Sequence, residues 1–167
     1  MTSDTGQGHL GTAHANLRIE TVNLFGGSVF VGDDVEISTL DHKDFLPQSY
    51  RNVISVEELG VTTEDSDDAW IYKYRYKVGI RLIRHEDEEA GKEKEFKPIV
   101  EITAIFSANY FSENKVSEEC IAEFSKENVG YNVWPFWREY AHSTCSRMGL
   151  SPVLEIPLYK VSKKAQK

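Results

Sequence analysis

Apolar and polar side chains alternate most regularly in this chain between Trp70 and Leu82. Every second position from Trp70 onward is aromatic or aliphatic, and the positions between them are mostly Lys or Arg. A period of two is typical of a β-strand, because a helix would scatter the apolar residues around its surface. Burying each large apolar side chain is worth about 1.5–3 kcal/mol. The pattern therefore predicts a long strand, from residue 70 to about 84, whose apolar side is covered and whose basic side faces solvent.

Three shorter stretches share this period and are also predicted to be strands. They cover residues 16–24 with a continuation at 28–31 beyond Gly26 and Gly27, residues 52–61, and residues 99–106. The stretch 32–51 has no clear period, and we expect it to cross the surface as a long connection. If the strand at 99–106 pairs with the long strand, Glu101 is expected near Lys73, Arg75 or Lys77.

Two helices are predicted after the strands. Residues 116–127 carry an apolar stripe, and Gly130 is expected to end this first helix. The second helix is expected to run from Pro135 in its first turn to Met148, with Gly149 as its stop. Strands followed by helices indicate the α+β class. The predicted fold is a four-stranded, strongly twisted antiparallel sheet with two C-terminal helices packed on one face.

Length and charge limit the classes of partner. The chain has 167 residues, and 27 Asp and Glu against 19 Lys and Arg give a net charge of −8. Nucleic acid is not expected as a partner, because a negative protein repels phosphate groups and because alternation separates the aromatic from the basic residues. We expect residues 1–15 to be a flexible leader, residues 16–160 to form a single domain, and residues 161–167 to be a basic flexible tail.

Motifs for catalysis, cofactors and membrane insertion are missing from the sequence. It contains no Gly-rich phosphate loop, zinc-binding helix pair or nucleophile elbow, and its acidic runs lack the spacing of a calcium loop. No apolar run reaches the roughly 18 residues that a membrane span needs. The two cysteines, Cys120 and Cys145, suggest neither a metal site nor a disulfide framework. We therefore expect a non-enzymatic cytoplasmic protein without a cofactor or bound metal.

The segment NVWPFWREYAHSTCSRMGLSPVLEIPLY, residues 132–159, resembles the C-terminal pattern of the SecB family of protein-export chaperones. The matching positions are Pro135, Phe136, Arg138, Glu139, Gly149, Pro152, Leu154, Ile156 and Pro157. The spacing departs from that of the family, because there is one extra residue between Arg138 and Gly149. The order of the predicted strands and helices is similar as well. The resemblance implies a SecB-like domain over the folded part of the chain.

The resemblance further implies an ATP-independent chaperone that assembles as a homotetramer, a dimer of dimers. Such a chaperone holds unfolded client polypeptides in apolar grooves between the sheet, the crossover and the second helix, either for protein export or as the dedicated chaperone of an antitoxin in a toxin–antitoxin system. The groove residues that it implies here are Phe45, Tyr50, Phe106, Tyr110, Phe111, Trp134, Phe136, Trp137 and Tyr140.

The resemblance also implies a docking face for the SecA translocase motor on the outer side of the sheet. Ile99 and Glu101 match two positions of that face, whereas Asn23 and Gly27 replace two of its acidic residues.

Two other functions fit the same residues. A carrier of a small apolar ligand would enclose a cavity between the sheet and the helices. A protein-interaction adaptor without chaperone action would bind one partner tightly and ignore unfolded chains.

Overall fold

The computed structural model describes residues 3–41, 43, 45–64, 68–89, 97–150 and 154–160. Four antiparallel strands form one sheet in the order β1-β4-β3-β2. The strands are β1 (Arg18–Val31), β2 (Phe45–Val61), β3 (Ala69–Arg84) and β4 (Val100–Ser112). The helices are α1 (Ser3–Asn16), α2 (His85–Glu89) and α3 (Glu118–Met148), with a short 3-10 helix, η1, at Ile37–Thr39.

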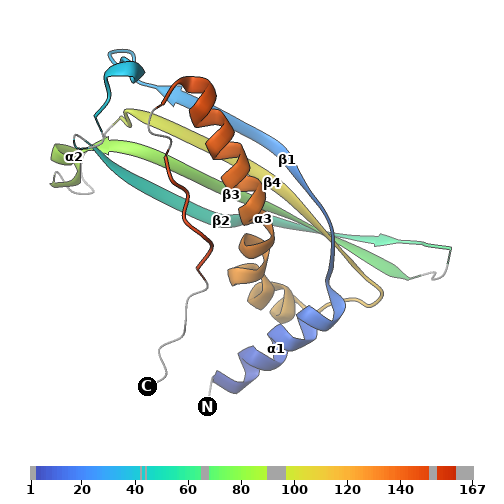
Figure 1. The fold of residues 1–167 in the computed structure, drawn as a ribbon. Helices are drawn as coiled ribbons and strands as arrows, with labels where there is room; N and C mark the ends of the chain where they lie inside the picture. The colour runs from blue at the N-terminus through green and yellow to red at the C-terminus, as the bar shows by residue number, and fades with distance from the viewer. Residues whose placement is uncertain are drawn as a thin grey trace.

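Helix α3 and the extended segment 154–160 lie on one face of this twisted sheet (Figure 1). The apolar side of β3 faces them, as the alternation predicts. Its buried residues are Tyr72, Tyr74, Tyr76, Val78, Ile80 and Leu82. They pack with the inward residues of β4 and with the buried side of α3 into one apolar core. The aromatic residues of the long strand therefore belong to the core, and its basic residues lie on the outer face.

The strands agree with the prediction in type and differ in extent. The first strand is one element with register shifts between Ile19 and Thr21 and between Leu24 and Gly26, and the second of these agrees with the irregularity predicted at the glycine pair. Strand β2 begins at Phe45 instead of residue 52, so the crossover is shorter than expected. Most of β2 is exposed at the edge of the sheet, which leaves little contrast between its two faces for a pattern to reveal. Glu101 pairs with Arg81 and not with the residues predicted.

One continuous helix, α3, replaces the two helices that were predicted. Gly130 does not end a helix: a Cβ atom there would lie 2.5 Å from the hydroxyl oxygens of both Tyr76 and Tyr159, so the glycine allows close packing instead. Pro135 lies inside α3 and not in a first turn. The predicted stop at Gly149 is confirmed, because this residue has a left-handed φ of 73° and its N–H donates to the carbonyls of Cys145 and Ser146.

The N-terminal leader was expected to be flexible, but residues 3–16 form helix α1, which packs against α3 (Figure 1). Ala13 and Leu17 are buried there, and the ring of His14 meets the ring of Phe124 edge to face at 5.7 Å. These few apolar contacts lie among glycines and polar residues, so they give no clear helical pattern in the sequence. The predicted basic tail, residues 161–167, lies outside the described residues.

Candidate functional site

One stripe of α3 contacts the C-terminal segment 154–160. The stripe consists of Glu127, Tyr131, Trp134 and Arg138. Steps of three and four residues place these side chains on the same side of a helix. The segment is extended and runs antiparallel to α3, because its later residues contact the earlier residues of the stripe (Figure 1). We call the space between this stripe and β2, in which the segment lies, the α3–β2 trough.

The helix holds the backbone of the segment. The indole N–H of Trp134 donates to the carbonyl oxygen of Pro157 at 2.7 Å, and Nε of Arg138 donates to the carbonyl oxygen of Ile156 at 3.0 Å. Leu154 and Ile156 are 9% and 8% exposed, whereas Glu155 between them is exposed. The trough therefore holds this segment through two backbone carbonyls and the apolar side chains of Leu154 and Ile156, whereas Leu158 is 71% exposed. Carbonyl groups are present in any polypeptide, so these two donors place no demand on sequence.

Tyr159 closes the contact between the helix and the sheet. Its ring centroid lies 5.3 Å from that of Trp134, and Cζ of Arg51 on β2 lies 4.1 Å from the same tyrosine ring. The hydroxyl of Tyr159 lies 3.0 Å from both the carbonyl oxygen and Oε2 of Glu127, so it can donate to either. Burial is the main cause that raises the pKa of Tyr159, so the hydroxyl stays protonated and remains a donor.

Apolar surface remains exposed where the described part of the segment ends. Tyr131 packs beside Tyr159 and is still 62% exposed. Ile54 and Val56 of β2 are 47% and 37% exposed. Val56 pairs with the buried Tyr74, so it belongs to the face of the sheet that α3 covers. Val56 and Tyr131 therefore add exposed apolar surface on the side of the sheet where α3 and residues 154–160 lie.

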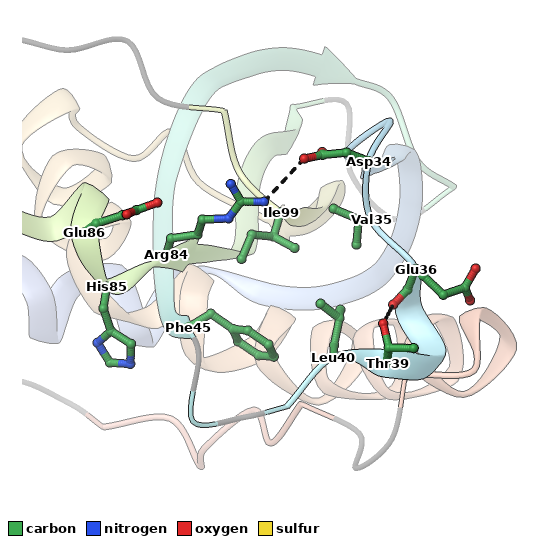
Figure 2. A pocket seen from close by; sticks show the side chains of 10 residues that line it. All are labelled: Asp34, Val35, Glu36, Thr39, Leu40, Phe45, Arg84, His85, Glu86 and Ile99. Atoms are coloured by element: carbon green, nitrogen blue, oxygen red, sulfur yellow. Dashed lines mark hydrogen bonds and ion pairs between the residues drawn. The ribbon is translucent and has the colours of Figure 1, made fainter.

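A second hollow lies at the end of the sheet where the crossover meets β3. It is a cavity of about 470 Å³ with an apolar floor formed by Val35, Leu40, Phe45 and Ile99. Charged groups stand around it, among them Asp34 and Arg84, which form an ion pair of 3.5 Å (Figure 2). This hollow can accept an apolar side chain beside a charged group. Phe45, a predicted groove residue, lies in its floor.

The other predicted groove residues are not gathered in one place. Trp134 lies in the α3–β2 trough, and Phe136 is 46% exposed on α3. The residues that pack between the sheet and α3 are Phe106, Tyr110, Trp137 and Tyr140. Trp137 is only 1% exposed and its ring stacks on that of Tyr140, so it belongs to the core. Direct contact with a client stays a prediction for the buried members of this set.

Tyr50 and Phe111 lie on the face of the sheet opposite α3. Their partners on β3 are Gly79 and Ile71, which alternate with the buried residues of that strand and lie on the same face as its basic residues. Paired residues of neighbouring strands share a face, so Tyr50 and Phe111 lie on this outer face too. Glu101 of the predicted motor-docking pair shares that outer face and accepts a hydrogen bond from the Tyr50 hydroxyl at 3.3 Å. The other member, Ile99, is 7% exposed. Motor docking stays a prediction.

Sequence reasoning did not identify Arg51, Tyr159 or the donor role of Arg138 in the trough. The sequence contained one usable signal: Trp134 and Arg138 are four residues apart and therefore share a side of the helix.

In the part of the chain that the structure describes, no group of three or more His, Cys, Asp or Glu residues is arranged to hold a metal ion. No described helix is both long and apolar enough to cross a membrane.

The four-stranded antiparallel sheet and the helix that covers it make this a SecB-like α+β fold. A solved structure with this fold is that of the Mycobacterium tuberculosis Rv1957 SecB-like chaperone in complex with a ChAD peptide from the Rv1956 HigA1 antitoxin. It matches with a TM-score of 0.61 and 15% sequence identity, covering 92% of this chain and 99% of that chain. No model of a known protein family and no curated protein sequence matches the chain.

Proposed function

We propose that the protein is an ATP-independent, non-enzymatic chaperone of the cytoplasm that holds extended, unfolded polypeptide in the α3–β2 trough. The observation that carries this proposal is that the trough holds residues 154–160 as an extended chain, through the carbonyls of Ile156 and Pro157. Main-chain contacts with pockets for alternate side chains are a recurring way to bind extended peptides. The SecB-like neighbour, which binds an antitoxin peptide, supports the same class of function.

The trough supplies the hydrogen-bond donors and the apolar contacts that an unfolded client lacks. Such a client offers unpaired carbonyls and apolar side chains in no fixed order, and Trp134 and Arg138 donate to carbonyls of any sequence. Tyr131 and Val56 add exposed apolar area on the same side of the sheet. A client enters either by displacing residues 154–160 or by lying on the exposed apolar surface beyond them. Aromatic surface suits this task, since it gives a large contact area at a small cost in side-chain entropy.

For the partner, we propose an antitoxin whose folding the protein assists. The support is the antitoxin peptide bound by the neighbour. General protein export is the alternative within the same proposal. The two differ in one measurement: a dedicated chaperone binds one antitoxin far more tightly than it binds unrelated unfolded proteins, whereas an export chaperone binds them with similar affinity.

The proposal is tested by diluting a chemically unfolded client into buffer without nucleotide and following its aggregation by light scattering. The wild-type protein is expected to suppress aggregation. The variant V56K/Y131K places two charges on the exposed apolar surface that a client meets by either route, so client affinity is expected to fall about tenfold.

The matched control is T62K/S146K, which adds two lysines at exposed polar residues, just after β2 and in the last turn of α3. It is expected to hold the client as the wild type does. Aggregation that the wild type leaves unchanged would overturn the chaperone proposal. Equal losses in the two double variants would overturn the assignment of the trough.

A further inference from the structure

The outer face of the sheet carries a row of basic side chains that the trough does not use. They are Lys73, Arg75, Lys77 and Arg81, at alternate positions of β3 on the side away from α3. Helix α3 and the segment 154–160 lie on the other face (Figure 1). On the neighbouring strands, Glu57 pairs with Lys73 and Glu101 pairs with Arg81. The two ends of the row thus face a carboxylate, and its centre does not.

The centre of the row is positively charged in a negative protein. Arg75 pairs with Ser55 and Ser107, and Lys77 pairs with Asn52 and Ile105, so all of their partners in register are neutral. Among the residues that the structure describes, neither of these two cations forms an ion pair. The whole chain has a net charge of −8. A positive centre on such a protein attracts an anion to this face and not to its other surfaces.

Aromatic rings hold both central cations in place. Cζ of Arg75 lies 3.9 Å from the ring centroid of Phe25, and Nζ of Lys77 lies 5.9 Å from that of Tyr50. The Tyr50 ring is itself fixed, because it lies so close over Gly79 that a Cβ there would come within 2.5 Å of it. A guanidinium that stacks on a ring keeps the N–H groups at its edge free for a carboxylate. Both cations are therefore positioned before an anion arrives.

We propose that this basic row binds an extended acidic segment of a partner protein, with carboxylates at alternate positions. Alternate residues of a strand are about 6.6–6.8 Å apart, and alternate side chains of an extended polypeptide have the same spacing. Arg75 can also bind a carboxylate with two parallel hydrogen bonds. Nucleic acid fits less well, since the net negative charge repels a phosphate backbone and the rings beside the row already stack on cations instead of being free for bases.

The experiment measures the affinity of a fluorescent seven-residue peptide with Glu at alternate positions and Thr between them, by anisotropy at low and moderate salt. The control peptide has Gln in place of Glu. Wild-type protein is expected to bind the acidic peptide, more weakly as salt rises, and to ignore the control peptide. The variant R75Q/K77Q is expected to bind the acidic peptide about tenfold more weakly.

The control variant K115Q/K126Q removes two positive charges elsewhere, at lysines that pair with Glu58 and Glu123. It should bind as the wild type does, whereas an equal loss in both double variants would show unspecific attraction and overturn the proposal. Absence of peptide binding, or tighter binding of single-stranded RNA than of the peptide, would also overturn it. The outcome is independent of the chaperone proposal, because R75Q/K77Q leaves the trough intact and is expected to suppress aggregation normally.

Discussion

Several tyrosines on the inner face of the sheet place their hydroxyl groups inside the protein. Tyr110 is 1% exposed, and its oxygen accepts a hydrogen bond of 2.9 Å from Nδ2 of Asn132 on α3. Burial raises the pKa of Tyr110 to about 12, and the bond from Asn132 opposes this in part. Burial raises the pKa of Tyr74 and Tyr159 as well. These residues combine the apolar area of a ring with one polar group that has to stay neutral.

The raised pKa values predict loss of stability at alkaline pH. In the unfolded chain a tyrosine ionises near pH 10, whereas folded Tyr110 keeps its proton until about pH 12. The contribution of this raised pKa to the free energy of unfolding is therefore complete below pH 10. It is lost as the pH rises from 10 to 12, by up to about 1.4 kcal/mol per pH unit. Urea unfolding between pH 9 and pH 11.5 measures this slope. The variant Y110F is expected to flatten it, and Y131F, at an exposed tyrosine, is the control. Identical slopes in Y110F and wild type would contradict this cause.

At the scale of elements, the sequence predicts best where the two sides of an element differ most. Strand β3 was predicted closely, because one side is buried under α3 and the other is basic. Strand β2 was predicted too short, because Phe45 to Arg51 lie in an edge strand with little contrast between its sides. Gly130 was interpreted as the end of a helix. The sequence alone does not distinguish a glycine that ends a helix from one that allows two tyrosine hydroxyls to pack closely against it.

The candidate site was less predictable than the fold. The aromatic pattern around residue 135 includes Trp134, which lies in the trough, but Arg51 and Tyr159 enter the trough only through tertiary packing, from β2 and from the segment after α3. Tyr50 lies on the face of the sheet away from the trough, and this position is set by the register of β2 with β3. A one-residue change in register would turn it to the other face.

Helix α1 allows a prediction about its own stability. A Cβ atom at Gly8 or Gly11 would meet no other atom within 4 Å, so alanine fits at both positions. Replacing a helical glycine by alanine gains up to about 1 kcal/mol. G8A/G11A is therefore expected to raise the free energy of unfolding by roughly 1–2 kcal/mol, measured by urea denaturation. G149A, at a residue with a φ of 73°, should lower it by roughly 1–2 kcal/mol. An unchanged G8A/G11A would mean that α1 does not pack on α3 in solution.

At the scale of the molecule, strand β1 forms an edge of the sheet and leaves much apolar surface exposed. Its exposed large apolar residues are Ile19, Leu24, Phe25, Val29 and Phe30, which are 40%, 52%, 63%, 45% and 40% exposed. Exposed apolar edge strands invite pairing with another chain. We propose that β1 associates with a second copy of the protein, so that the protein is a homo-oligomer. The trough lies beside β2, at the opposite edge of the sheet, and stays open in such an assembly.

This arrangement predicts that assembly and client binding can be separated. Lysines at Leu24 and Val29 place charge on the exposed part of β1, so L24K/V29K is expected to sediment as a monomer in analytical ultracentrifugation where the wild type sediments as a dimer or tetramer. The control I54K adds a lysine on β2 and should keep the wild-type assembly. Since Trp134, Arg138 and Arg51 come from one protomer, the monomeric variant should still bind an unfolded client, with reduced avidity but a similar affinity per chain. A wild type that sediments as a monomer would refute the assembly, and a monomeric variant that has lost all client binding would show that the site needs two copies.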